Sequence, residues 1–261
     1  MAARLRSLQA RLLPHGPWDV ARQLLLFVVA YNGYRLVRGE ADRPGVTAAA
    51  FQHARDLINV ERTLHLFVEP TVQGWAMSSK PIIDVASWLY INAQTSVTVG
   101  SLVFIYLAHN RSFYFVRNMF MVAMGIALVG YSVFPTAPPR FLPEWGFVDA
   151  VSNFAGVSHQ NGTIDALFNP YAAVPSMHVC FATMIGLSLA RLVRHRAIRV
   201  LWALYPLLVT FVIVATANHF LADAFFGACT AGVSAYAARW MARARPRVWA
   251  FSPRPGTTQT A

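Results

Sequence analysis

His219 and Asp223 are the residues whose types and spacing are best suited to chemistry. They stand four residues apart in the stretch TANHFLAD, so on a helix both side chains would lie on one face. Asp223 is the only acidic residue after Asp165 and lies inside an apolar run, where an ionisable group is a functional candidate. A carboxylate bound to one imidazole nitrogen fixes the tautomer and leaves the other nitrogen free to attack or to accept a proton. We expect Asn218 to cap this helix, with His219 at its first position.

A second candidate group lies where a polar loop meets an apolar helix, in the run Pro175, Ser176, Met177 and His178. Proline suits the first position of a helix. The next three residues would then form the first turn, where unpaired N–H groups and the helix dipole attract anions. The serine hydroxyl adds a donor, and the histidine can donate a proton. From this stretch alone, a capped helix with an interfacial histidine is an equal alternative.

Arg140 is the only basic residue of the loop 135–174, and so long a loop is often functional. A snorkelling interfacial arginine is the alternative. With Ser176 and the amides of the following helix, including that of Met177, Arg140 can hold a phosphate group. His219 can then attack phosphorus, and His178 can protonate the departing oxygen. Water or an acceptor hydroxyl would complete the reaction, and this chemistry requires neither a metal nor another cofactor.

The composition indicates that these residues belong to a membrane protein. The chain has 261 residues, 56% hydrophobic and 13% charged, whereas soluble domains carry about 25% charged residues. Several apolar runs approach the ~20 residues needed to cross a bilayer. The net charge of +11 comes from arginines at the ends of these runs, which is how membrane proteins are oriented, so we expect no nucleic-acid partner. Cys180 and Cys229 lie in apolar runs and form no disulfide or zinc pattern.

The sequence predicts an all-α integral membrane protein, a six-helix bundle in the cell membrane. Arginine-rich connections alternate with acidic or nearly uncharged ones, which places both termini in the cytoplasm and the candidate site on the outer face. Residues 1–19 are then a basic cytoplasmic N-terminus, 20–240 the catalytic domain, and 241–261 a basic, disordered tail. The predicted spans cover residues 20–37, 82–108, 114–134, 176–192, 199–215 and 219–238.

Residues 46–77, between the first two spans, are amphipathic. Apolar residues recur near helical spacing between charged ones, which is typical of helices that lie at the membrane interface. Glu61 and Glu69 belong to this segment. We interpret them as part of a solvated helix face rather than as residues that contact a substrate.

Three other functions compete with phosphate chemistry. A transporter or channel could use an intramembrane His and Asp as a proton relay, but it would place polar groups near the middle of the membrane. His178, His219 and Asp223 could instead bind zinc, which would leave Ser176 and Arg140 unexplained. A membrane scaffold without activity would leave the His219–Asp223 pair unexplained.

These residues resemble the motifs of the type 2 phosphatidic acid phosphatase superfamily, which includes lipid phosphate phosphatases and vanadium haloperoxidases. Its motifs are Lys-x6-Arg-Pro, Pro-Ser-Gly-His and Ser-Arg-x5-His-x3-Asp. The sequence retains Arg140 of the first, Pro175 to His178 of the second with Met177 in place of glycine, and His219-x3-Asp223 of the third. The resemblance covers roughly residues 80–240. It implies a phosphohistidine on His219 and the acid–base role for His178.

The departures from these motifs bear on the substrate. Val133 stands at the lysine position, and Val212 and Ile213 stand at the serine and arginine positions of the third motif. The stretches TAPPR, AVPSMH and TANHFLAD are more similar to the branch with inositol phosphorylceramide synthases and their bacterial relatives, which can transfer a phosphoryl head group to a lipid hydroxyl. The expected substrate among the membrane lipids is phosphatidic acid, a polyprenyl phosphate or diphosphate, or an inositol-bearing lipid. Hydrolysis and transfer to a hydroxyl acceptor both remain open.

Overall fold

A computed structural model describes residues 16–38, 45–155 and 171–249 of the chain. These residues are helical apart from loops and an isolated parallel bridge between Thr136 and Ala172. The α-helices are α2 (Pro17–Arg38), α3 (Val46–Thr63), α4 (Glu69–Met77), α5 (Lys80–Ala108), α6 (Asn110–Val133), α7 (Ala150–Ala155), α9 (Met177–Leu192), α10 (Arg196–Ala215), α11 (Leu221–Ala244) and α12 (Pro246–Trp249). Two 3-10 helices, η1 (Pro139–Phe141) and η2 (Pro143–Trp145), lie between α6 and α7.

Four helices, α5, α6, α10 and α11, are long and apolar enough to cross a membrane. They indicate a membrane protein, as the composition predicted. The other two predicted spans are also helical: α2 has 22 residues and α9 has 16. At about 1.5 Å per residue, α9 spans less than the ~30 Å hydrocarbon core.

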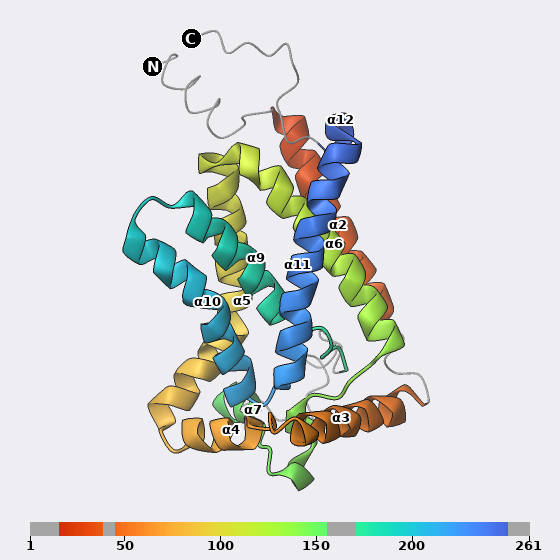
Figure 1. The fold of residues 1–261 in the computed structure, drawn as a ribbon, viewed down its shortest axis with the longest axis vertical. Helices are drawn as coiled ribbons and strands as arrows, with labels where there is room; N and C mark the ends of the chain where they lie inside the picture. Colours follow the sequence, from red (N-terminus) through yellow and green to blue (C-terminus); the bar gives the residue numbers. More distant parts are fainter. Residues whose placement is uncertain (1–15, 39–44, 156–170, 250–261) are drawn as a thin grey trace.

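The long helices run lengthwise, and α3, α4 and α7 gather at one end (Figure 1). Helices α3 and α4 lie across that end, beside α7 and the start of α11, whereas α12 and the start of α2 lie at the opposite end. The connections from α6 to α9 and from α10 to α11 also reach the end covered by α3 and α4. The predicted site residues therefore all come from segments at one end of the bundle.

Buried polar side chains fix α2 to α6. Asp19 Oδ2 accepts a hydrogen bond of 2.7 Å from the Tyr114 hydroxyl, and Arg117 Nη1 donates one of 2.8 Å to Gln23 Oε1. Asp19 Oδ1 also accepts hydrogen bonds from Arg22 and Gln23 of its own helix. Because a buried charge is tolerated only when it is paired, these contacts fix the position of α2 along α6.

Two glycines allow the start of α9 to pack closely between α6 and α11. A Cβ atom on Gly130 of α6 would lie 2.8 Å from Cδ of Pro175. A Cβ atom on Gly227 of α11 would lie 2.4 Å from the carbonyl oxygen of Ser176. Both distances are shorter than van der Waals contact, so only glycine fits without displacing the backbone that carries Ser176.

We expect Gly227→Ala to destabilise the protein by about 1–3 kcal/mol, the usual cost of overpacking. The added methyl group would meet backbone atoms, which cannot rotate away as a side chain can. The measurement is the thermal midpoint of unfolding in detergent. Gly232→Ala is the matched control, because it lies in the same helix and a Cβ atom there would meet nothing within 4 Å. Equal midpoints for the two variants would contradict the close contact.

The C-terminal segment differs from the prediction. Helix α11 continues to Ala244, and α12 covers Pro246–Trp249, so the expected disorder from residue 241 is wrong for the described part of the tail. Met241 and Ala242 are half-buried, and the N–H of Arg245 donates a hydrogen bond of 3.0 Å to the carbonyl oxygen of Met241, so the helix continues past the predicted span. The rest of the predicted tail, residues 250–261, lies outside the described residues, as do residues 1–15 of the predicted N-terminal segment.

Candidate active site

His219 and Asp223 lie together at the start of α11. The His219 Nδ1 atom is 3.2 Å from Asp223 Oδ2. The same carboxylate oxygen accepts a hydrogen bond of 2.9 Å from the backbone N–H of Phe220, which makes Asp223 part of the cap of its helix. His219 and Asp223 are both buried, with 5% and 0% of their surface exposed. Because the carboxylate accepts from Nδ1, it leaves Nε2 of the imidazole free for chemistry.

The helix begins later than the sequence suggested. Phe220 is the N-cap and Leu221 the first helical residue, so His219 precedes α11, and Asn218 is not its cap. Asn218 instead donates hydrogen bonds of 3.1 and 2.9 Å to the carbonyl and hydroxyl oxygens of Thr216. These bonds hold the short turn between α10 and α11, where the N–H groups of Asn218 and His219 both point to the carbonyl oxygen of Ile213.

The start of α9 is also shifted by one or two residues. Ser176 is the N-cap and Met177 the first helical residue, so Pro175 lies outside the helix rather than at its first position. The reason is a tertiary contact: the backbone N–H of Ser176 donates a hydrogen bond of 3.1 Å to the carbonyl oxygen of Asp223. Ser176 is fully buried, and its hydroxyl has no hydrogen-bond partner among the described residues. An unpaired buried donor of this kind is uncommon.

His178 lies beside His219. Their ring centroids are 5.4 Å apart, with the ring planes at 64°. On its other side His178 stacks on Tyr90 of α5, with centroids 4.7 Å apart and planes at 20°. The stacking limits the imidazole of His178 to a narrow range of orientations. Tyr90 was not among the predicted site residues, because nothing in the local pattern of α5 marks it.

Arg140 approaches the same group from the 135–174 loop. Its Nη1 donates a hydrogen bond to Asn218 Oδ1, next to His219, and its backbone N–H donates one of 2.8 Å to Ala217. The guanidinium also forms an ion pair of 3.7 Å with Asp149. Arginine has five N–H donors, more than these contacts use. Asn218 and Asp149, which orient Arg140, were not predicted, because each depends on a partner distant in sequence.

Glu61 and Glu69 are buried, so the prediction that they belong to a solvated helix face is wrong. Only 3% of Glu61 and 0% of Glu69 is exposed. Glu61 Oε1 accepts a hydrogen bond of 2.7 Å from the backbone N–H of Ala222, and Glu69 Oε1 accepts one of 2.7 Å from that of Leu221. Burial and the neighbouring Glu69 raise the pKa of Glu61 to about 9. The amphipathic pattern correctly predicted that α3 and α4 are helical. It could not show that these carboxylates bind N–H groups of α11, which lies far away in the sequence.

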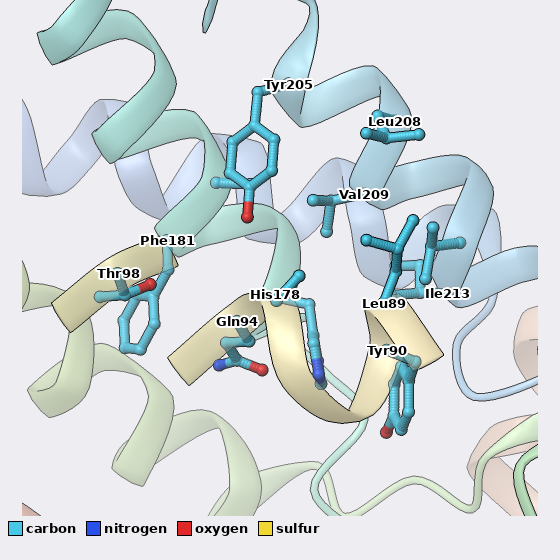
Figure 2. A pocket seen from close by; sticks show the side chains of 13 residues that line it. Leu89, Tyr90, Gln94, Thr98, His178, Phe181, Tyr205, Leu208, Val209 and Ile213 are labelled. Carbon is cyan, nitrogen blue, oxygen red and sulfur yellow. The ribbon is translucent and has the colours of Figure 1, made fainter. Parts of the chain in front are cut away.

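An apolar pocket opens beside His178 between α5, α9 and α10 (Figure 2). Figure 2 shows the His178 ring between Gln94 and Tyr90, and it shows Phe181 on the Gln94 side of His178. The α10 side of the pocket is lined by Tyr205, Leu208, Val209, Val212 and Ile213. Of the predicted site residues, His178 alone lines this pocket.

The remaining predicted residue is Met177, whose side chain is half-buried and packs against the core formed by α5, α6, α9 and α11. Only its backbone N–H remains a candidate for anion binding. The proposed zinc alternative receives no support, because no three His, Cys, Asp or Glu side chains of residues 16–38, 45–155 and 171–249 are grouped to hold a metal ion.

Comparison with known proteins gives one match. The family model described as the PAP2 superfamily matches residues 55–237, from α3 to the last turns of α11. No curated protein and no solved structure matches the chain. The match covers most of the chain and includes Arg140, Ser176, His178, His219 and Asp223, and it gives no support to a transporter. This protein belongs to the PAP2 superfamily and has the phosphatase or phosphotransferase type of function of that superfamily.

Proposed function

We propose that this protein is a membrane enzyme that cleaves a lipid phosphate ester or diphosphate through a phosphohistidine intermediate on His219. The observation that carries the proposal is the buried His219–Asp223 pair at 3.2 Å, which faces His178 at 5.4 Å between ring centroids. The hydroxyl of Ser176 has no partner among the described residues, and the backbone N–H of Ser176 binds Asp223. The backbone N–H of Arg140 binds Ala217, in the connection that leads to His219. These groups supply a nucleophile, a proton donor and phosphate ligands within one cluster.

The reaction has two steps. Nε2 of His219 attacks phosphorus, the bond from phosphorus to the lipid oxygen breaks, and His178 gives a proton to that departing oxygen. Water or an acceptor hydroxyl then attacks the phosphohistidine, the P–N bond breaks, and His178 takes the proton from the attacking oxygen. Arg140, the Ser176 hydroxyl and the N–H groups at the start of α9 bind the phosphoryl oxygens. Asp223 stabilises the imidazole of His219 as its positive charge develops.

The positive charge of these ligands is sufficient for a mechanism without a metal ion. Arginine and backbone N–H groups stabilise phosphoryl charge when they are held in place before the reaction. Arg140 is held by Asn218 and Asp149, and the start of α9 is held by Asp223. Activity in the presence of a chelator is therefore expected.

The membrane disposition follows from the charges. We propose that α2 and α9 complete a six-span bundle with α5, α6, α10 and α11, and that α3 and α4 lie at the outer interface. The arginines between α9 and α10, including Arg191 and Arg199, mark the cytoplasmic end. The site, with α3 and α4, then faces the outside of the cell membrane. A lipid head group would reach it from the outer leaflet.

A lipid substrate is supported by the apolar side chains around His178, which line a small pocket between α5, α9 and α10, and by the apolar helices that place the site in a membrane protein. Transfer to a hydroxyl acceptor, as in the branch with inositol phosphorylceramide synthases, would use the same phosphohistidine intermediate with a hydroxyl group in place of water. Val133, Val212 and Ile213 stand where the superfamily motifs have polar or basic residues, so the site has fewer cations. A less charged site is better suited to a phosphodiester or a monoanionic phosphate than to a phosphate with two charges.

The experiment that tests this function is phosphate release by the detergent-purified protein from a panel of lipid phosphates, with EDTA present and His219→Ala in parallel. Release that survives chelation and disappears in the variant is the expected result. If water is a poor acceptor, adding myo-inositol or a lipid alcohol should produce a new phosphate monoester of that hydroxyl, or a new phosphodiester when the donor lipid is itself a phosphodiester. The absence of both hydrolysis and transfer, together with no binding of orthovanadate, would overturn the proposal.

Arg140→Ala should lower kcat/KM by about 10²–10³-fold, because it removes a charged ligand of the phosphoryl group. Arg140→Lys should recover only part of this loss, since an ammonium group cannot contact Asn218 and a phosphate in the same fork geometry. Steady-state kinetics with the best lipid substrate checks both variants. Arg55→Ala is the control, because Arg55 also forms an ion pair, with Glu144 at 3.9 Å, but lies outside the site. Equal losses for Arg55→Ala and Arg140→Ala would contradict a specific role.

A further inference from the structure

Three carboxylates bind three successive N–H groups at the start of α11. Asp223 binds the N–H of Phe220 at 2.9 Å, Glu69 that of Leu221 at 2.7 Å, and Glu61 that of Ala222 at 2.7 Å. Helices usually leave these N–H groups to water or to one capping side chain. Here α3, α4 and α11 each supply one carboxylate, so the N-cap and the first two residues of α11 are held by carboxylates from three helices.

The second oxygens of these carboxylates lack donors among the described residues. Glu61 Oε2, Glu69 Oε2 and Asp223 Oδ1 are buried, and none has a hydrogen-bond donor among the described residues. No arginine, lysine or histidine of the described chain forms an ion pair with Glu61 or Glu69. A helix N-terminus offsets only about half a charge, and three buried negative charges in one turn would repel strongly. One proton between Glu61 and Glu69 would give two of these three oxygens, Glu61 Oε2 and Glu69 Oε2, a partner in each other.

We propose that Glu61 and Glu69 share one proton and act as positioning residues, which hold the first turn of α11 and with it the His219–Asp223 pair. The effect on catalysis rests on the function proposed above, whereas the shared proton does not. The two carboxylates bind the N–H groups of adjacent residues, and burial and the charge of Glu69 are the main causes that raise the pKa of Glu61 to about 9. The pair then carries one negative charge near neutral pH. A phosphate at the adjacent site meets less repulsion than it would from two ionised glutamates.

The shared proton predicts the direction in which the stability of the folded protein changes with pH. The titratable groups that face Glu61 are Glu69 from α4 and Asp223 from α11, and Asp223 is itself bonded to His219. In the unfolded chain a glutamate titrates near pH 4.3, well below the folded value of about 9. Between these values the native state holds one more proton on this group, so its contribution to stability is greatest below about pH 4.5 and declines as pH rises towards about 9, by up to tenfold in the unfolding equilibrium per pH unit.

Glu61→Gln (E61Q) tests the role of the proton while keeping the shape and hydrogen bonds of the side chain. The amide oxygen of this variant can accept from the N–H of Ala222, and its NH₂ group can donate to Glu69 without titrating. Glu61→Ala removes both contacts and should lower kcat at least tenfold, and E61Q should recover most of that loss. The recovered activity should lack the decline above about pH 9 that we expect of the native protein. Glu69→Gln is the mirror variant and should behave alike.

Two measurements on the detergent-purified protein need no turnover. The infrared difference between the native protein and E61Q near neutral pH should contain the C=O stretch of a protonated carboxylic acid. The thermal midpoint should fall with rising pH more steeply in the native protein than in E61Q. Glu144→Gln, half-exposed at the same end of the bundle, should change neither quantity.

The outcomes are distinct. No carboxylic acid band, or the same pH slope in E61Q and the native protein, would overturn the shared proton. A folded E61Q protein that shows the expected infrared difference but has no activity at any pH would overturn the positioning role. A native protein without turnover on any substrate, but with the band and the slope, would count against the proposed function and not against the proton.

Discussion

His219→Ala is expected to abolish turnover, with kcat lower by at least about 10⁴-fold, while the protein remains folded. The variant removes the atom that would bond to phosphorus, and neither Ser176 nor His178 lies where it could take over that role with the help of Asp223. The fold should survive because His219 precedes α11 rather than belonging to it. Its removal leaves the cap bond from Phe220 to Asp223 in place.

The measurement is kcat on the best lipid substrate, together with the thermal midpoint in detergent. His195→Ala is a suitable control, because this exposed histidine caps α10 at the other end of the bundle. The assignment of the nucleophile would be wrong if His219→Ala retained full activity in a folded protein. A phosphoryl label that is stable to base and labile to acid should be trapped on the native protein and be absent from the variant.

Asp223→Asn is expected to lower kcat by roughly 10²- to 10⁴-fold. The carboxylate oxygen that faces His219 also accepts from the N–H of Phe220, so the amide of the variant should turn its oxygen to this position. The Nδ1 proton of His219 then keeps its acceptor, and the loss comes from the missing negative charge beside the imidazole. The amide NH₂ would take the place of Oδ1, which is buried and has no partner within residues 16–38, 45–155 and 171–249, and so stability should fall by about 1–3 kcal/mol.

This variant is checked by single-turnover kinetics, which separate the formation of the phosphohistidine from its breakdown. The first step should be slowed more, because positive charge develops on the imidazole as the P–N bond forms. Ser234→Ala serves as a control for changes in α11, since Ser234 is a buried polar residue of the same helix that lies outside the site. Unchanged kinetics in Asp223→Asn would show that the pair at 3.2 Å has no catalytic role.

The helices could be predicted closely from the sequence, and the reason is physical. Apolar runs bounded by arginine or proline mark the long helices, because a membrane leaves the backbone no other partners than its own. The predicted run 82–108 became α5 (Lys80–Ala108), and 199–215 became α10 (Arg196–Ala215). The helix starts that carry the site were misplaced by one or two residues, since the N–H of Ser176 binds the carbonyl oxygen of Asp223 in another helix and the N–H of Phe220 binds the Asp223 side chain as a cap.

The cluster around His219 could be predicted because its members carry their chemistry in their residue types. The residues that hold it could not. Glu61 lies 161 residues before the N–H group that it binds, and Glu69 lies 152 residues before its own partner. In a local window their charges look like those of any solvated helix face. Pairing over such distances depends on how α3 and α4 fold across the end of the bundle, which no local pattern encodes.

The contacts that fix α2 also set an order of assembly during synthesis. Tyr114 follows its partner Asp19 by 95 residues, and Arg117 follows Gln23 by 94. At roughly 5–20 residues per second, the ribosome makes these partners about 5–20 s after α2. Until then Asp19 is satisfied by its own neighbours, with hydrogen bonds of 3.0 Å from Arg22 and 2.9 Å from Gln23. The first helix therefore carries its own partners for Asp19 Oδ1 and gains the partner of Oδ2 only when α6 arrives, so its final position is set late in biogenesis.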